Sequence, residues 1–166
     1  MTCSGKNKLE LPHRAILLVG PTGSGKTPLG DMMESLGLNG RRCCHFDFGA
    51  RFRMAAASDV PPAPLDADDL AVIKESMRTG ALLTDEQFPI ARKILTAFLE
   101  EGCSERNGLI VLNGMPRHEG QAKCIEQVVD VVCVVELSCD AGTVLERIRL
   151  DTGGDRGGRR DDLPEL

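Results

Sequence analysis

Three uninterrupted apolar runs stand out along the chain, at Ala15–Val19, Leu109–Leu112 and Val131–Val135. Each run is short and apolar at successive positions, which is typical of a parallel strand that is buried on both faces. A further short run at Cys43–Phe46 fits the same interpretation. The pattern therefore predicts four short strands.

Apolar residues at helical spacing fill the segments between these strands. The expected helices lie at 29–36, 49–57, 68–79, 84–101, 121–129 and 141–150. Gly37 is expected to end the first helix, and Thr84–Gln87 has the pattern of a capping box. Pro61–Pro64 must form a loop. Strands that alternate with helices indicate an α/β fold of three layers, α/β/α, in which helices cover both faces of a parallel sheet.

Length and charge narrow the class of protein. A chain of 166 residues is expected to form a single domain, residues 1–166. Its 20 Lys and Arg against 25 Asp and Glu give a net charge of −5, and it has no Trp or Tyr. This composition disfavours broad binding to nucleic acid or anionic membranes. Since Ala15–Val19 is too short for a signal peptide or a membrane span, we expect a cytoplasmic monomer with neither kind of partner.

The cysteines show no metal-binding or redox spacing. Seven of them stand at positions 3, 43, 44, 103, 124, 133 and 139, without a Cys-x-x-Cys pair, and the chain has three His. Zinc sites require clustered thiols and imidazoles. We therefore expect reduced, buried thiols.

The strongest motif is Gly20-Pro-Thr-Gly-Ser-Gly-Lys-Thr27, which matches G-x-x-x-x-G-K-[ST] between a predicted strand and a predicted helix. In such a P-loop the backbone N–H groups surround a phosphate and the helix N-terminus adds a positive dipole. Lys26 would reach the transferred phosphate, and the Thr27 hydroxyl would hold Mg²⁺. The predicted ATP site comprises Gly20, Gly23, Ser24, Gly25, Lys26, Thr27 and Pro28.

A second motif, Asn113-Gly-Met-Pro-Arg117, follows the strand at 109–112 directly, and Gln121 comes four residues later. Here the chain resembles the adenylate kinase family of nucleoside monophosphate kinases, whose corresponding motif is Asp-Gly-Phe-Pro-Arg followed by Gln. The resemblance continues through Phe46–Arg53, Gly80–Glu86, Leu145–Ile148 and Arg159–Glu165, and covers about residues 14–166.

The resemblance implies reversible transfer of a phosphoryl group from Mg²⁺-ATP to a nucleoside monophosphate, with AMP as the expected acceptor. It also implies a core of residues 14–46 and 103–150, a helical flap that binds the monophosphate at about 47–102, and a short lid at about 151–160. The segment Asp151–Gly158 is too short for a zinc-bearing lid. The family continues with a further helix and strand beyond the position of Leu166, so we expect the sequence to be either a fragment or a reduced form.

Individual roles are carried over from the family by position. Arg53 and Arg117 would hold the acceptor phosphate, Gln121 would pair with its base, and Phe48 could stack on that base. Ala81, Leu82, Leu83, Gly114, Met115 and Pro116 would line the same pocket. Arg147 would cover the donor nucleotide, and Arg159 would reach the transferring group from the lid. Lys26, Arg117 and Arg159 are the expected catalytic cations.

Two departures from the family concern the metal and the acceptor. Asn113 replaces the Asp that helps to hold hydrated Mg²⁺, so we expect a weakened metal site. Asp47-Phe48 replaces a Ser-Thr pair. These departures leave two alternatives open, a nucleotide-binding module without turnover and a P-loop kinase acting on another small molecule, of the shikimate or gluconate type.

Overall fold

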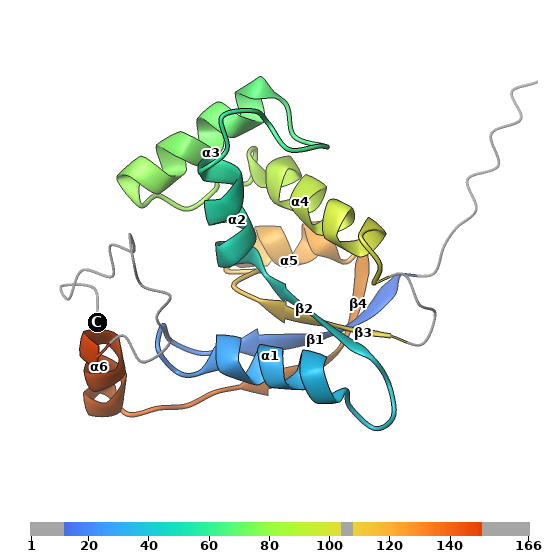
Figure 1. Cartoon of the computed structure of the whole chain (residues 1–166), viewed down its shortest axis with the longest axis vertical. Helices are drawn as coiled ribbons and strands as arrows, with labels where there is room; N and C mark the ends of the chain where they lie inside the picture. Colours follow the sequence, from blue (N-terminus) through green and yellow to red (C-terminus); the bar gives the residue numbers. More distant parts are fainter. Residues whose placement is uncertain (1–11, 104–107, 151–166) are drawn as a thin grey trace, which may run out of the picture.

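The computed structural model describes residues 12–103 and 108–150 and shows an α/β fold around one parallel sheet (Figure 1). The four strands are β1 (His13–Val19), β2 (Cys43–Asp47), β3 (Leu109–Asn113) and β4 (Val129–Glu136). They pair in the order β2-β3-β1-β4, all parallel. The predicted parallel α/β architecture is confirmed at this level.

Six helices connect and flank the described strands. They are α1 (Lys26–Leu36), α2 (Phe48–Ala56), α3 (Ala67–Thr79), α4 (Phe88–Glu100), α5 (Glu119–Ile125) and α6 (Ala141–Leu150). Gly37 ends α1 as expected, and its N–H donates to the carbonyl oxygen of Met33 at 2.8 Å. Figure 1 shows α1 along one side of the sheet, with α2, α4 and α5 on the other side.

Successive side chains of the strands alternate between two hydrophobic clusters. Ile16, Leu18 and Val111 pack on the α1 side, whereas Phe46 and Leu112 belong to the larger cluster on the α4 side. Both faces of the inner strands are therefore buried, which explains why these strands read as continuous apolar runs rather than as alternating ones. The arrangement fits a helix–sheet–helix stack of three layers.

The segment 47–102, expected to form the flap, consists of helices that are anchored to different degrees. Helix α4 buries seven side chains, and its Phe98 ring lies 5.1 Å from the Phe46 ring of β2. Helix α3 buries only Leu70 and Ile73 and packs on α2. Because α3 packs mainly on another helix rather than on the sheet, it is the helix of this segment that can be displaced at the lowest cost.

Two predicted helix boundaries are wrong by four residues, and the other boundaries differ by at most three. The helix expected at 121–129 ends at Ile125, because Val129 pairs with His13 and starts β4. The helix expected from Thr84 begins at Phe88, with Pro89 in its first turn. The side chain of Gln87 still accepts a hydrogen bond from the Thr84 N–H at 3.1 Å, which is half of the expected capping box.

The expectation of reduced, buried thiols is also wrong for part of the set. Cys44 and Cys103 form a disulfide, with Cα atoms 6.1 Å apart. Cys44 alternates with Cys43 along β2 and points to the α4 side, where the chain returns after α4. Cys133 is exposed on β4, whereas Cys43 is buried, and this burial raises the pKa of its thiol.

In the part of the chain that the structure describes, no helix has the length and apolar character needed to span a membrane.

The start of α3 is held by a charged cluster with a defined pH dependence. Asp66 and Asp69 form a capping box, and Lys93 of α4 contacts both carboxylates. The pKa of Asp66 is lowered, first by the hydrogen bond from the Asp69 N–H and then by Lys93, and the pKa of Lys93 is raised by the two carboxylates. The carboxylate contribution to stability is therefore present above about pH 4 and lost below it, and the ammonium contribution is lost above about pH 10.

We accordingly expect Asp66→Ala to lower the urea midpoint of unfolding at pH 7 and to lose this effect progressively as the pH falls below about 4, because the wild-type carboxylate then becomes protonated. Asp68→Ala is the matched control, since it removes an acidic side chain from the same helix end without removing the cap. Equal effects of the two variants at pH 7 would contradict the assignment of the cap and its ion pair.

Candidate functional site

A cleft of about 940 Å³ lies at the edge of the sheet where β1, β2 and β3 end. Its walls come from the glycine-rich loop 20–25, the start of α2, the α3–α4 connection, the segment after β3 and one residue of α6. Its volume is at the upper end of the range for small-molecule sites, about 300–1,000 Å³. The cleft is therefore large enough for a ligand of nucleotide size or larger.

The glycine-rich loop leaves β1 under tight steric constraint. Gly20 has a φ of 141°, and a Cβ at this position would lie 2.5 Å from the carbonyl oxygen of Leu137, so only glycine fits. Within the loop, Ser24 N–H donates to the carbonyl of Pro21, while the N–H groups of Gly23 and Gly25 make no backbone hydrogen bond among the described residues. These groups and the first turn of α1 provide donors for an anion.

Ser24 supplies a further sign of a ligand site in this loop. Ser24 is 8% exposed, and its hydroxyl is buried without a hydrogen-bond partner in the described part of the chain. A buried hydroxyl without a partner carries a free-energy cost, which a ligand oxygen at the loop would remove.

Two cations lie on the loop. The Lys26 ammonium donates to the carbonyl oxygens of Gly20 and Pro21, each at 2.7 Å. Arg147 of α6 directs one guanidinium nitrogen to the carbonyls of Gly23 and Ser24, at 3.3 and 3.4 Å. Helix α6, which is distant in sequence, therefore contributes positive charge to the loop.

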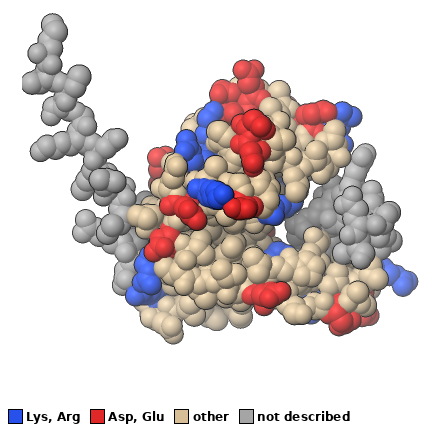
Figure 2. All heavy atoms as spheres, turned by 180° about the vertical axis from the view of Figure 1, so that it is seen from behind, with Lys and Arg blue, Asp and Glu red and all other residues tan. Residues whose placement is uncertain are grey.

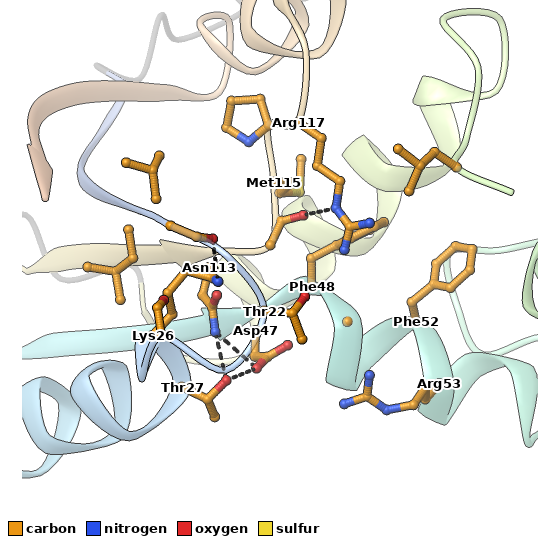
Figure 3. Close-up of a pocket in the computed structure, with 18 of the residues that line it drawn as sticks. Thr22, Lys26, Thr27, Asp47, Phe48, Phe52, Arg53, Asn113, Met115 and Arg117 are labelled. Carbon is orange, nitrogen blue, oxygen red and sulfur yellow. Dashed lines mark hydrogen bonds between the residues drawn. The ribbon is translucent and has the colours of Figure 1, made fainter. Parts of the chain in front are cut away.

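Two further arginines reach the cleft from other elements. Figure 3 shows Arg53 extending from α2 and Arg117 from the segment after β3 toward the same space. Arg117 is oriented by a hydrogen bond from its Nε to the Gly114 carbonyl at 2.9 Å. Gln121 is buried, and its side-chain oxygen accepts from the Arg117 N–H at 2.8 Å. Its amide nitrogen, by contrast, makes no hydrogen bond to the described residues.

Apolar residues complete the wall of the cleft near Arg53 and Arg117. Leu82 is exposed, whereas Leu83 and Met115 are buried in the core beside the cleft. The Phe48 ring contacts the Phe52 ring at a centroid distance of 5.3 Å. Phe48 is therefore at once a wall of the cleft and the edge of an aromatic cluster.

The structure brings the sequence-predicted site residues together. The described residues among them that line the one cleft are Gly20, Gly23, Ser24, Gly25, Lys26, Thr27, Pro28, Phe48, Arg53, Ala81, Leu82, Leu83, Gly114, Met115, Pro116, Arg117, Gln121 and Arg147. Arg159 and the expected lid at about 151–160 lie outside the described residues.

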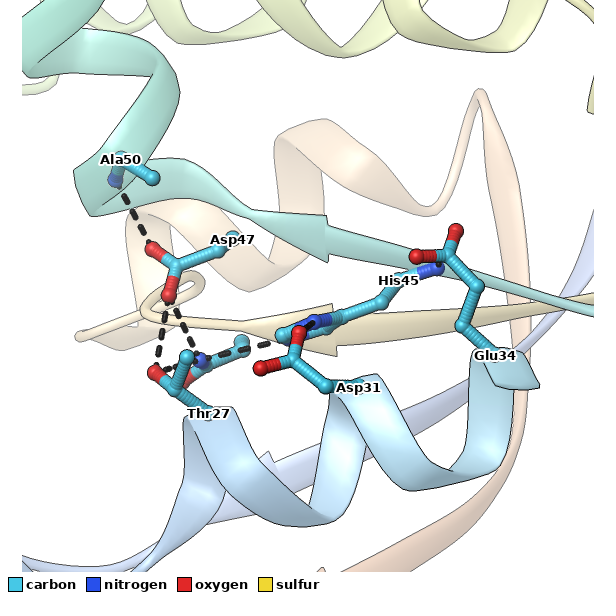
Figure 4. A network of polar contacts seen from close by, with 7 residues as sticks. Thr27, Asp31, Glu34, His45, Asp47 and Ala50 are labelled. Atoms are coloured by element: carbon cyan, nitrogen blue, oxygen red, sulfur yellow. Dashed lines mark hydrogen bonds and ion pairs between the residues drawn. The ribbon is translucent and has the colours of Figure 1, made fainter. Parts of the chain in front are cut away.

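A network of polar side chains joins the ends of α1, β2 and β3 (Figure 4). The Thr27 hydroxyl donates to Oδ2 of Asp47 at 2.9 Å. Nδ2 of Asn113 donates to the same Asp47 oxygen at 3.1 Å and to the Thr27 oxygen at 3.0 Å. The second Asp47 oxygen accepts from the Ala50 N–H at 2.8 Å and caps α2. Asp47 is therefore fixed through both of its oxygens.

His45 extends this network below the floor of the cleft. Its side chain is 3% exposed, and Nδ1 lies 2.8 Å from an Asp31 carboxylate oxygen, with Nε2 3.4 Å from Nδ2 of Asn113. The His45 backbone N–H donates to Glu34 at 3.1 Å. With the proton on Nδ1, the ring donates to Asp31 and the unprotonated Nε2 faces the Asn113 amide nitrogen, whose two hydrogens are shared among Asp47, Thr27 and His45.

Sequence reasoning did not assign a role at the site to Asp47 or His45. Asp47 follows a predicted strand, as Asn113 does. Because parallel strands end at the same edge of a sheet, the sequence contained a signal that these two residues could be neighbours. His45 could not have been found in this way, because its contacts depend on α1 packing closely at Gly30. A Cβ on Gly30 would lie 2.3 Å from the His45 ring.

The charges of the cleft differ from those of the chain as a whole. Its described lining contains four cations, Lys26, Arg53, Arg117 and Arg147, and one acid, Asp47, in a chain of net charge −5. On the face of the molecule seen in Figure 2, acidic and basic side chains are interspersed over a largely uncharged surface. Positive charge is thus concentrated in the cleft, which suits a small polyanion.

No protein-family model matches this chain, and no curated protein matches it significantly. The functional interpretation therefore depends on the geometry of the cleft and on the motifs that line it.

The contact between Gly30 and His45 gives a direct test of the polar network. Replacing glycine by alanine within a helix ordinarily stabilises it by roughly 1 kcal/mol. For Gly30→Ala we expect the opposite sign, with a loss of about 1–3 kcal/mol in the free energy of unfolding, because the new methyl group displaces the buried His45 ring.

The double variant Gly30→Ala with His45→Ala relieves this clash and should be more stable than the sum of the two single effects, as measured by urea denaturation. Additive effects in this double-mutant cycle would show that the two positions are not coupled.

Proposed function

We propose that the protein is a nucleoside monophosphate kinase of the adenylate kinase type, which transfers a phosphoryl group reversibly from Mg²⁺-ATP to a monophosphate, with AMP as the favoured acceptor. The observation that carries the proposal is the pairing of cations in one cleft. Lys26 and Arg147 lie at the glycine-rich loop, and Arg53 and Arg117 reach the same cleft from α2 and from the segment after β3.

The two cation pairs suit different phosphate groups. The loop offers backbone N–H donors, a helix N-terminus and the Lys26 ammonium, which together favour the phosphates of a triphosphate. The forked guanidinium groups of Arg53 and Arg117 match the oxygens of a dianionic monophosphate. A donor and an acceptor bound in this way would have their reacting phosphates between the two pairs.

Direct transfer between such phosphates does not require a covalent bond to the protein. Positioning and charge stabilisation provide nearly all of the catalysis in phosphoryl transfer. Lys26 and Arg117 would act on the transferring group, with Arg159 as a further candidate from the expected lid. The weakly anchored α3 provides a flap that can close and exclude water, which protects ATP from hydrolysis.

The donor set at the loop fits the expected metal. The oxygens of Thr27 and Asp47 are hard ligands, and Mg²⁺ usually binds through one or two protein oxygens together with phosphates and water. Such a site does not require a cluster of three or more His, Cys, Asp or Glu, and the described residues contain none. When bound, Mg²⁺ would neutralise phosphate charge.

One observation favours a second candidate, a nucleotide-binding module without turnover. Asn113 presents an amide nitrogen, rather than a carboxylate, to Thr27. If this exchange weakens metal binding, ATP would bind without efficient transfer.

A coupled assay for diphosphate formation tests the proposal, with Mg²⁺-ATP and each of AMP, CMP, UMP and GMP as acceptor. We expect turnover with at least one of them and the highest kcat/KM with AMP. ATP binding without turnover on all four acceptors would favour the binding module, and turnover only with shikimate or gluconate would favour the other small-molecule kinases.

The assigned cation pairs predict that two variants change the KM of different substrates. Arg53→Ala should raise the KM for AMP by about 10- to 100-fold and leave the KM for ATP nearly unchanged, because a charged hydrogen bond contributes roughly 1.5–3 kcal/mol. Arg147→Ala should raise the KM for ATP instead. These constants would be measured by steady-state kinetics with the second substrate saturating.

Arg78→Ala is the control, since Arg78 pairs with Glu75 on the exposed side of α3 and does not line the cleft. If Arg53→Ala and Arg147→Ala changed the same KM, the assignment of separate donor and acceptor subsites would be wrong.

A further inference from the structure

The exchange of Asp for Asn at position 113 is accompanied by a carboxylate on the neighbouring strand. Asp47 ends β2, Asn113 ends β3, and the two residues are register partners in the sheet. Oδ2 of Asp47 lies 2.9 Å from Oγ1 of Thr27 and 3.1 Å from Nδ2 of Asn113. A negative charge is therefore present where the three elements meet, although position 113 does not provide it.

The orientation of the Asn113 amide is determined by its surroundings. Its nitrogen is the atom within 3.0 to 3.4 Å of the Thr27 oxygen, the Asp47 carboxylate and Nε2 of His45. All three atoms can accept a hydrogen bond, so the nitrogen rather than the oxygen must face them. Since Asn113 is 4% exposed and His45 is held by Asp31, the amide has little freedom to turn.

In this orientation Asn113 presents a donor, and an amide nitrogen is not a ligand for Mg²⁺. It is instead a suitable partner for a carboxylate that binds a metal, since such carboxylates are usually hydrogen-bonded by neighbouring residues. A carboxylate at position 113 would lie beside Asp47 and repel it. Asp47 and Asn113 are therefore complementary.

The distance between the Thr27 and Asp47 oxygens also suits a metal. Adjacent ligands of an octahedral Mg²⁺ with bonds of 2.0–2.1 Å lie about 2.9 Å apart. Oγ1 of Thr27 and Oδ2 of Asp47 are 2.9 Å apart and hold this spacing without a metal. Both residues line the cleft beside Lys26, and Asp47 is the acidic residue of its described lining.

We infer that Asp47 provides the carboxylate that binds the nucleotide-associated Mg²⁺, together with the hydroxyl of Thr27, and that Asn113 is a positioning residue for this carboxylate. This inference rests on the proposed function, because the metal would arrive with ATP. The metal-binding carboxylate then lies at the end of β2. The exchange of Asp for Asn at position 113 moves this negative charge from β3 to β2 and does not remove it from the site.

The variant Asp47→Asn separates metal binding from the structural role of Asp47. Asparagine is as good an N-cap as aspartate, so the hydrogen bond from the Ala50 N–H and the start of α2 are retained. The substitution removes the negative charge, and an amide nitrogen takes the place of the oxygen that accepts from Thr27 and Asn113. Asp47→Ser, which also caps helices, is a second variant for use if the first does not fold, as judged by circular dichroism and thermal unfolding.

The measurement is the affinity for ATP by titration calorimetry, with Mg²⁺ and with EDTA, combined with the affinity of Mn²⁺ for the ATP complex by electron paramagnetic resonance. For Asp47→Asn we expect a loss of about 10- to 100-fold in metal affinity, of the size found when metal sites are perturbed. Metal-free ATP affinity should not fall.

The double variant Asp47→Asn with Asn113→Asp returns the carboxylate to β3 at unchanged net charge and should recover most of the metal affinity. Unchanged metal affinity in Asp47→Asn would overturn the inference, as would a wild-type protein whose ATP binding does not respond to Mg²⁺. Metal-dependent ATP binding that requires Asp47, in a protein without turnover, would support the inference while contradicting the proposed kinase activity.

Discussion

The register of the parallel sheet is the constraint on which the candidate site depends. Leu18 of β1 and Asp47 of β2 both pair with Asn113 of β3, so the three strands end at one edge. This edge receives the glycine-rich loop after β1, the first turn of α2 after β2 and the arginine segment after β3. A slip of one residue in either pairing would reverse the faces of the strand and separate Asp47 from Thr27.

The same edge explains how an acidic protein can carry a cationic cleft. Lys26, Arg53, Arg117 and Arg147 come from four separate segments, and only the fold gathers them. Beneath them, a chain of polar contacts from Asp31 through His45 to Asn113 connects the surface of α1 to the floor of the cleft. Helix α4 fixes one wall to the sheet through Phe98 and its neighbours, whereas α3 is held mainly by α2 and the Lys93 cluster. The cleft thus combines a rigid floor with a movable wall.

Local patterns were sufficient to predict most of the fold. The apolar runs gave the positions of the inner strands, because burial on both faces leaves a clear signal, and Gly37 correctly marked the end of α1. Val129 was placed in a helix because its pairing with His13 is a contact between distant segments. The Cys44–Cys103 disulfide was missed for the same reason, since no spacing rule links those positions. For the site, the glycine-rich loop and the Asn113–Arg117 motif were visible as sequence, and the structure places both at the cleft. The relation of Asp47 to Asn113 and the burial of His45 required the register of the sheet and the close packing of α1 at Gly30.

We propose that one cleft holds a triphosphate and a monophosphate together, each at its own pair of cations. Titration calorimetry on the full chain tests this claim most directly, with AMP added to protein that is saturated with a non-hydrolysable Mg²⁺-ATP analogue. We expect one site per chain for each nucleotide, with AMP binding retained when the analogue is bound. Competition between the two ligands for a single site, or the absence of binding by either, would contradict it.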